Sequence, residues 1–210
     1  GSTQSITGVG FQPDTVWIKD RTSAESPHLY DAIRGATETL LTNQTQAEFT
    51  GADRLTAFDS DGFTGVDGTS SPNYYFNESA KTFVAWNWLG ANGTVTNTAG
   101  NNIDSTVSAN PTAGFSICKY TGAGASLDIQ VKHGLSVKPT FFITRNLEDA
   151  NSWAVYHGSN TTAPETDYLK LDTTGATSDQ GEIWLDTAPT SAIFTAGDHS
   201  SSNRSGDDFI

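Results

Sequence analysis

Thr82-Phe83-Val84-Ala85-Trp86-Asn87-Trp88 is the stretch that decides the fold class, because apolar and polar side chains alternate along it. A period of two places successive side chains on opposite faces of an extended strand. Four more runs of this kind occur, each bounded by Gly, Asn, Asp, Ser or Pro: Thr15–Lys19, Phe115–Tyr120, Phe141–Thr144 and Tyr168–Leu171. The sequence therefore predicts an all-β protein of antiparallel strands, arranged as in sandwiches and jelly rolls.

Turn and helix signals agree with this prediction. Asp59-Ser60-Asp61-Gly62, between two phenylalanines, indicates a tight hairpin turn, since Asp and Gly tolerate the positive φ that such turns require. Helical periodicity is weak, and the one candidate, Thr45–Leu55, would form one or two turns or equally a loop.

Composition and charge exclude several classes of protein. The 210 residues carry a formal charge of −13, which argues against binding to nucleic acid and to anionic membrane surfaces. No apolar run is long enough to span a bilayer, so we expect no membrane insertion. The single cysteine, Cys118, cannot form an internal disulfide, and its place in an alternating strand predicts a small buried side chain.

The chain resembles itself when residues 1–84 are placed on residues 127–210, an offset of 126. The matches lie in similar contexts: Gln4 and Gln130, Gly8 and Gly134, Pro13 and Pro139, Tyr30 and Tyr156, Phe83 and Phe209. We therefore predict tandem β-sandwich repeats over 1–90 and 115–210, joined by a linker over 91–114 that is rich in Gly, Asn, Thr and Ser. On this prediction the first repeat lacks its N-terminal strand and the second stops within its last strand, so we expect a longer polypeptide.

Motifs for metal binding and catalysis are absent from the sequence. Asp59 and Asp61 could begin a calcium loop, but Phe63 stands where an EF-hand needs an oxygen ligand, so a plain turn is favoured and only another type of calcium site stays open. The four histidines show no metal-ligand spacing, and no Gly-x-Ser-x-Gly motif occurs. Glu78, Glu165 and Glu182 form no glycosidase-like motif. We expect no enzyme and no cofactor.

Aromatic side chains give the best argument for binding. Trp86 and Trp88 are two residues apart and so share one face of their strand. That face could stack on sugars, or it could form a core stripe together with Val84. His28 and Tyr30, near a second predicted strand, are further candidates for a ligand groove. Five Asn-x-Ser/Thr sites could accept glycans, but a chain this rich in such residues generates several by chance: Asn43, Asn77, Asn92, Asn160 and Asn203.

Longer motifs carry a family resemblance. These are Gly10–Arg21, then His28-Leu29-Tyr30-Asp31 with Arg34-Gly35, then Phe58–Thr64 and Phe83-Val84-Ala85-Trp86. Together they resemble a repeat of the large tail-fibre and appendage proteins of marine bacteriophages and cyanophages. Asn92–Val95 and Ser108–Ile117 are similar to the connector of that family, and Trp153–His157 is similar to its second-copy variant.

The resemblance implies concanavalin-like or laminin-G-like β-sandwiches in a virion structural protein at the virion surface, an extracellular location. Its implied role is structure or host attachment, with other copies, other virion proteins or a host cell-surface glycan as partners. Lectin-like display of linked weak sites would gain avidity. The alternative is a carbohydrate-binding module of a larger secreted or virion-borne polysaccharide-active protein.

Overall fold

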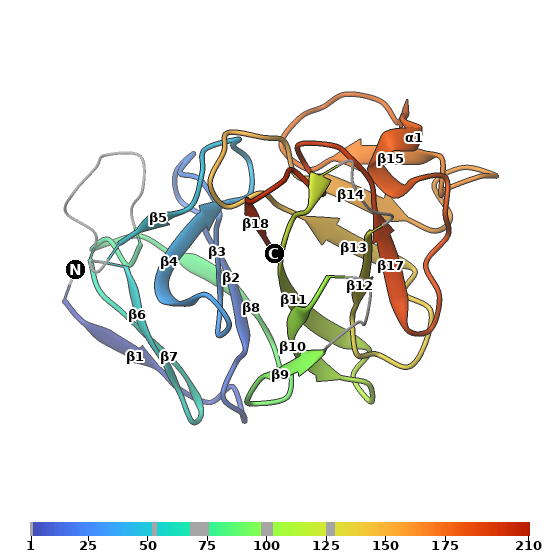
Figure 1. Ribbon diagram of the computed structural model, residues 1–210. Helices are drawn as coiled ribbons and strands as arrows, with labels where there is room; N and C mark the ends of the chain where they lie inside the picture. The colour runs from blue at the N-terminus through green and yellow to red at the C-terminus, as the bar shows by residue number, and fades with distance from the viewer. Residues whose placement is uncertain (1, 52–53, 68–75, 98–102, 125–128) are drawn as a thin grey trace. The chain divides into compact units, whose positions relative to one another are not determined.

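The computed structural model describes residues 2–51, 54–67, 76–97, 103–124 and 129–210 (Figure 1). It forms two compact units: the first comprises residues 1–44 and 48–93, and the second comprises residues 45–47 and 94–210. Strands make up nearly all of the regular structure described in both, and all sheet pairs are antiparallel. The predicted all-β fold is confirmed.

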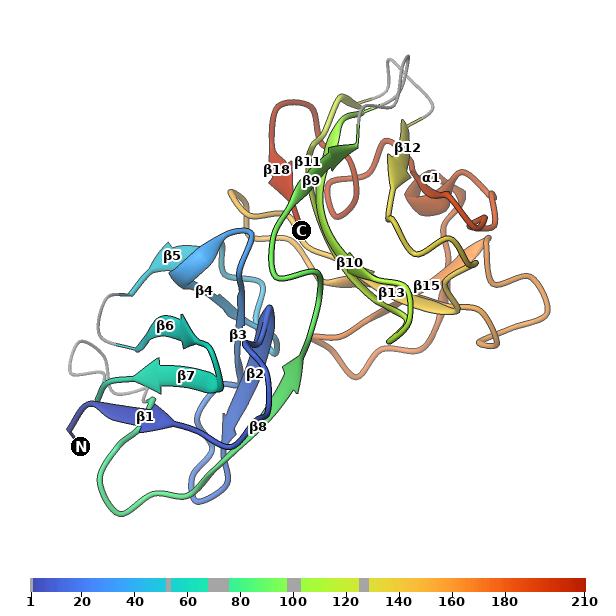
Figure 2. The ribbon, with the colours of Figure 1, turned by 90° about the horizontal axis from the view of Figure 1, so that it is seen from below.

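The first unit contains two sheets (Figure 2). The smaller has the order β1-β7-β6, with bounds Gln4–Ile6 for β1, Leu55–Asp59 for β6 and Gly62–Gly65 for β7. The larger has the order β5-β4-β3-β2-β8, with bounds Thr15–Asp20 for β2, His28–Asp31 for β3, Gly35–Leu41 for β4, Phe49–Thr50 for β5 and Phe83–Trp88 for β8.

The hairpin of β6 and β7 turns through Ser60 and Asp61, as the sequence predicts. Gly62 follows with φ of 148°, and a Cβ there would collide with the carbonyl oxygen of Ile6 on the neighbouring strand. Glycine is therefore needed both for the backbone conformation and for the close approach of β1.

Alternate residues of the strands supply the core of the first unit. The buried cluster consists of Val16, Ile18, Tyr30, Leu55, Phe63 and Phe76, and Phe83 and Ala85 of β8 pack against it. Both sheets contribute, as expected for a β-sandwich, where the inner faces of two sheets share one core.

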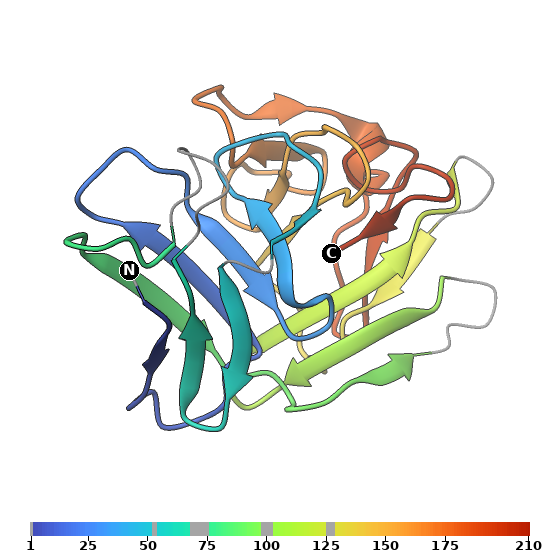
Figure 3. The same cartoon turned by 90° about the vertical axis from the view of Figure 1, so that its left-hand side faces the viewer.

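The second unit contains three sheets and one helix. The first sheet has the order β18-β11-β10-β9, with bounds Val95–Asn97 for β9, Ser105–Asn110 for β10, Phe115–Thr121 for β11 and Asp208–Phe209 for β18. The neighbouring strands β10 and β11 are drawn green to yellow-green in Figure 3. The second sheet pairs β12, Ile129–Lys132, with β17, Ile193–Ala196. The third has the order β13-β14-β15-β16, with bounds Phe141–Thr144 for β13, Ala154–His157 for β14, Asp167–Lys170 for β15 and Ser178–Asp179 for β16.

Two aromatic clusters fill the second unit, and Phe142 packs against both. One surrounds Tyr120, Phe194 and Phe209, and the other contains Tyr156 and Trp184. Trp184 ends the helix α1, Gly181–Trp184. Within the described ranges, no helix is long and apolar enough to cross a bilayer.

The two units share a strand-pairing scheme. Residue numbers differ by 126 between the starts of β2 and β13 and between those of β3 and β14. The bridge between Asp20 and Phe83 in the first unit has its counterpart, at the same offset, in the bridge between Asn146 and Phe209. This correspondence is what the predicted repeat requires, and the tandem origin itself stays a prediction.

Two predicted segments differ from the structure. The interval 91–114, predicted as a linker, contains the strands β9 and β10. Ser105 and Val107 of β10 bury their side chains, and the backbone of β10 pairs with β11. Residues 98–102 of this interval lie outside the described ranges. Within Thr45–Leu55, the candidate for one or two helical turns, the structure has the strand β5 and the start of β6, and residues 52 and 53 lie outside the description.

Candidate functional site

An outward row of aromatic side chains on β8 is the candidate functional site. Phe83 and Ala85 of β8 pack against the core of the first unit. Because side chains alternate along a strand, Val84, Trp86 and Trp88 face the other side of the sheet. Trp86 is 47% exposed. The core-stripe interpretation is therefore excluded for Trp86, which is open to a ligand, while Val84 and Trp88 are half-buried.

Trp17 fixes the position of Trp86 from the neighbouring strand. The two residues are paired between β2 and β8, and their ring centroids lie 6.0 Å apart at an interplanar angle of 55°. The indole nitrogen of Trp17 donates a hydrogen bond of 3.1 Å to the Thr42 hydroxyl. The exposed ring of Trp86 therefore rests on a second ring that is itself held, which lowers the entropy lost when a ligand binds.

His28 and Tyr30, predicted to line a ligand groove, lie in the core instead. They are 1% and 0% exposed and contact each other and the ring of Phe76. Burial lowers the pKa of His28 to about 3, and the positive charges of Arg54 and Lys19 act in the same direction. Burial likewise raises the pKa of Tyr30. Strand parity places both side chains on one face of β3, and packing against Phe76 makes that face the inner one.

Asp59 and Asp61, the calcium candidates, make hydrogen bonds within the protein. One oxygen of Asp61 accepts from the backbone N–H of Gly8 at 2.9 Å, and the other accepts from that of Gly10 at 2.6 Å. These bonds lower the pKa of Asp61. Asp59 accepts from the Thr64 hydroxyl at 2.7 Å. Among the described residues, no three His, Cys, Asp or Glu side chains gather into a metal-binding group.

Asp31, Arg34 and Glu48 form a buried ion-pair cluster. Asp31 accepts hydrogen bonds from the backbone N–H groups of Ile33 and Arg34, which shapes the turn between β3 and β4. The Arg34 guanidinium pairs with both Asp31 and Glu48, and its side chain is 1% exposed. The motif His28–Arg34 therefore has a structural explanation, since removing one partner would leave a buried charge uncompensated.

The cysteine and the glutamates named in the sequence analysis have different neighbours in the structure. Cys118 is half-buried in β11, not fully buried as predicted; its sulfur contacts the Ser116 hydroxyl at 3.4 Å, and desolvation raises its pKa to about 11. Burial and then the charge of Glu165 raise the pKa of Tyr156. Burial lowers the pKa of His199, and the nearby Glu182 opposes that shift. A thiol of raised pKa is a poor nucleophile.

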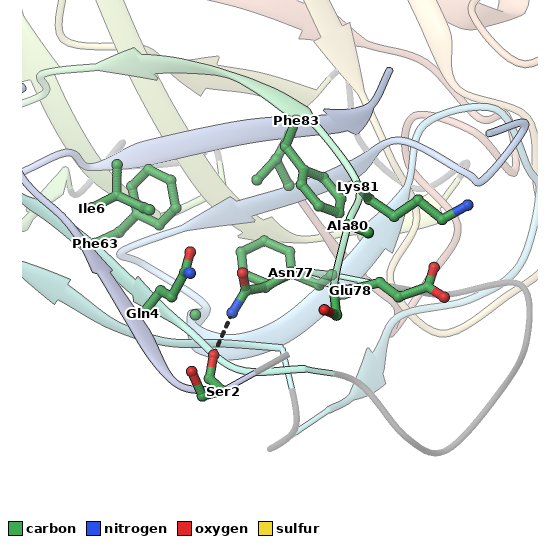
Figure 4. A pocket seen from close by; sticks show the side chains of 13 residues that line it. Ser2, Gln4, Ile6, Phe63, Asn77, Glu78, Ala80, Lys81 and Phe83 are labelled. Carbon is green, nitrogen blue, oxygen red and sulfur yellow. Dashed lines mark hydrogen bonds between the residues drawn. The ribbon is translucent and has the colours of Figure 1, made fainter. Parts of the chain in front are cut away.

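A cleft of about 450 Å³ lies in the first unit, between β1 and the segment that leads into β8 (Figure 4). Its apolar lining consists of Ile6, Ile18, Phe63, Phe76, Ala80 and Phe83. Gln4, Asn77, Glu78 and Lys81 add polar groups, and the Asn77 amide donates a 2.7 Å hydrogen bond to the Ser2 carbonyl. Sequence reasoning did not find this cleft, although Asn77 and Phe83 match Asn203 and Phe209 at the repeat offset.

Fold and site together define an all-β protein of two units, one of which presents an exposed tryptophan on a sheet face. The family model described as "Domain of unknown function (DUF7483)" matches residues 1–210, so the chain belongs to the DUF7483 family. Searches of curated proteins and of solved structures returned no match.

Proposed function

We propose that the chain is a non-catalytic adhesion module of a phage tail fibre or appendage, displayed at the virion surface to attach to host cell-surface glycan. The observation that carries the proposal is the exposed ring of Trp86, which contacts the ring of Trp17 on the neighbouring strand. A flat indole on a sheet face presents an apolar surface to the C–H face of a sugar ring, while solvent keeps access to the sugar hydroxyls.

The proposed site is small, so each contact is weak. One tryptophan buries too little area to give tight binding after the loss of translational and rotational freedom. Several copies on one appendage would raise the overall avidity without any new contact, because each later contact becomes intramolecular. Copies of the chain and other virion proteins are the structural partners in this proposal.

A glycan array with matched variants tests the proposal. Wild-type protein, displayed in several copies, should bind a defined set of polysaccharides, and Trp86→Ala should lose about tenfold or more in affinity, as for the loss of a central aromatic contact. Phe141→Ala is the matched control, because Phe141 is an aromatic residue that is 53% exposed in the second unit. Equal losses for both variants, or binding that neither variant affects, would contradict the assigned site.

The alternative proposal is a carbohydrate-binding module of a larger secreted or virion-borne polysaccharide-active protein, and the same tryptophan face supports it. Mass spectrometry of purified virions that carry this gene separates the two. We expect the chain among the structural proteins of the particle. Its recovery only in the culture supernatant, attached to a polysaccharide-degrading domain, would favour the alternative.

A further inference from the structure

One wall of the cleft in the first unit is the segment Phe76–Phe83, which we call the lip. It leads into β8, the edge strand of its sheet, whose outer side pairs with no strand among the described residues. Ile6 and Phe63 face it from β1 and β7 across the cleft (Figure 4). Ile6 is 40% exposed on this wall, whereas Phe63 lies deeper and is 2% exposed.

The second unit contains the same segment at residues 202–209, at an offset of 126. The identical residues are Asn77 and Asn203, Ser79 and Ser205, and Phe83 and Phe209. The backbone conformation recurs at one position, where Ala80 has φ of 64° and its counterpart Gly206 has φ of 86°. It differs at another, because Asn77 has φ of 64° whereas Asn203 is not among the residues of positive φ. Positive φ is uncommon for alanine, so its presence at the matching position is specific evidence for a common turn.

A backbone hydrogen bond recurs in the same turn. The N–H of Lys81 donates to the carbonyl of Glu78 at 3.3 Å, and the N–H of Asp207 donates to the carbonyl of Arg204 at 3.3 Å. The turns at 78–81 and 204–207 are therefore equivalent, although Phe76 stands where the second unit has Ser202. What the second unit binds beside its turn indicates what the lip is suited to receive.

In the second unit this element holds the end of β11 and the residues that follow it. Tyr120 pairs with Phe209, stacks on its ring at 5.3 Å, and donates its hydroxyl to the Ser202 carbonyl at 2.6 Å. Asn203 then accepts from the backbone N–H of Ala123 at 2.8 Å. A strand bearing one inward aromatic residue thus fills the space beside Phe209.

Gly122, two residues after Tyr120, has to be glycine because it lies directly against the backbone of Arg204. Its N–H donates to the Asp207 carbonyl at 2.8 Å, and a Cβ at this position would collide with the carbonyl of Arg204. The pattern that this element accepts is therefore an aromatic residue, any residue, and then glycine. Trp86 takes no part in this argument, so the acceptor site is independent of the proposed glycan site.

We propose that the cleft of the first unit is an acceptor site for an extended peptide strand with the pattern aromatic-x-Gly. The strand would pair antiparallel with the start of β8 and place its aromatic ring in the cleft beside Phe83. This is recognition by strand addition, in which main-chain hydrogen bonds provide affinity and a side-chain pocket provides specificity. The β11 of a second copy is not the occupant, because it already pairs with β10 and β18 in its own unit.

A peptide titration tests the proposal. The probe is a fluorescent peptide of residues 115–124 with Cys118→Ser to prevent oxidation, and binding to the intact chain is followed by fluorescence anisotropy. We expect saturable binding, and peptides that also carry Tyr120→Ala or Gly122→Val should bind at least about tenfold more weakly. The glycan array is an independent measurement, since Trp86→Ala should leave peptide binding unchanged.

Two protein variants locate the site. Ile6→Arg places a charge on the cleft wall at a residue that is 40% exposed, so folding should be retained and peptide binding lost. Val137→Arg, at a residue 55% exposed in the second unit, is the matched control and should bind as wild type. Circular dichroism checks that both variants are folded.

Three results would overturn the proposal. The first is absence of peptide binding to folded wild-type protein, and the second is equal binding to the Ile6→Arg and Val137→Arg variants. The third is a dimer of the wild-type chain that Ile6→Arg abolishes and excess peptide leaves intact, which would identify a second copy as the occupant. Light scattering coupled to size exclusion measures that last outcome.

Discussion

The buried imidazole of His28 predicts how the stability of the first unit depends on pH. In the folded state its pKa is lowered to about 3 from 6.5, because burial disfavours the charged ring and Arg54 and Lys19 add positive charge nearby. The Tyr30 hydroxyl lies 3.4 Å from its Nδ1, and no acidic residue contributes to the shift. In the unfolded chain the ring takes up a proton near pH 6.5, so acid favours unfolding.

The magnitude follows from the two pKa values. Stability from this group is fully present above pH 6.5 and is lost as the pH falls from 6.5 toward 3, since only the unfolded state binds the proton in that window. Between pH 8 and pH 5 the loss is about 2 kcal/mol, at 1.36 kcal/mol per pKa unit. A typical urea slope converts this to a midpoint shift of about 1 M.

The assay compares wild type with His28→Phe, which keeps an aromatic ring against Phe76 and cannot be protonated. Urea unfolding at pH 8 and pH 5 should show a loss of stability in the wild type that exceeds the loss in the variant by about 2 kcal/mol. Taking this difference removes the contributions of His133 and His199, whose pKa values burial also lowers. An imidazole resonance of His28 that titrates near pH 6 in the folded protein, or equal losses in both proteins, would refute the reasoning.

Three further predictions concern single positions. Asp61→Ala should lower the thermal unfolding midpoint measured by calorimetry, because the N–H groups of Gly8 and Gly10 lose their acceptor. Millimolar Ca²⁺ should not shift the midpoint of the wild type, and a clear stabilisation by Ca²⁺ would count against this account. Gly65→Ala should destabilise the first unit by roughly 1–3 kcal/mol in urea unfolding, because the new Cβ would overlap the Phe76 ring, whereas Gly93→Ala, with open space around it, should cost less. Cys118 should react with a thiol reagent at pH 8 much more slowly in the folded protein than in urea, since burial raises its pKa to about 11, and equal rates would contradict the burial.

The strands were the part of the fold that local sequence could predict. The runs at 15–19, 82–88, 115–120, 141–144 and 168–171 coincide with β2, β8, β11, β13 and β15 to within one or two residues. The turn at Ser60-Asp61 was also predictable, because Asp and Gly have short-range conformational preferences. In contrast, β10 lies in a stretch of polar residues, and its pairing with β11 depends on contacts that no local pattern records.

The candidate site was predictable only in part. The sequence placed Trp86 and Trp88 on one face, and the structure turned that face outward. His28 and Tyr30 are polar enough to suggest a site, yet both are buried, and the parity of β3 alone could not show which face enters the core. The cleft beside Ile6 and Phe83 could not be predicted from local patterns, because its walls come from segments far apart in the chain.

Sequence alone determined that the chain forms strands, where several of them begin and end, and which residues of β8 share a face, because these properties depend on neighbours along the chain. Tertiary structure decided which face enters the core. A period of two separates two faces but assigns neither to the interior, and for β8 that choice fell to Phe83 and Ala85, which pack against the cluster around Val16 and Phe63. The same packing left Trp86 exposed, and the strand order placed β8 at the edge of its sheet among the described residues; the two proposed sites depend on these two features.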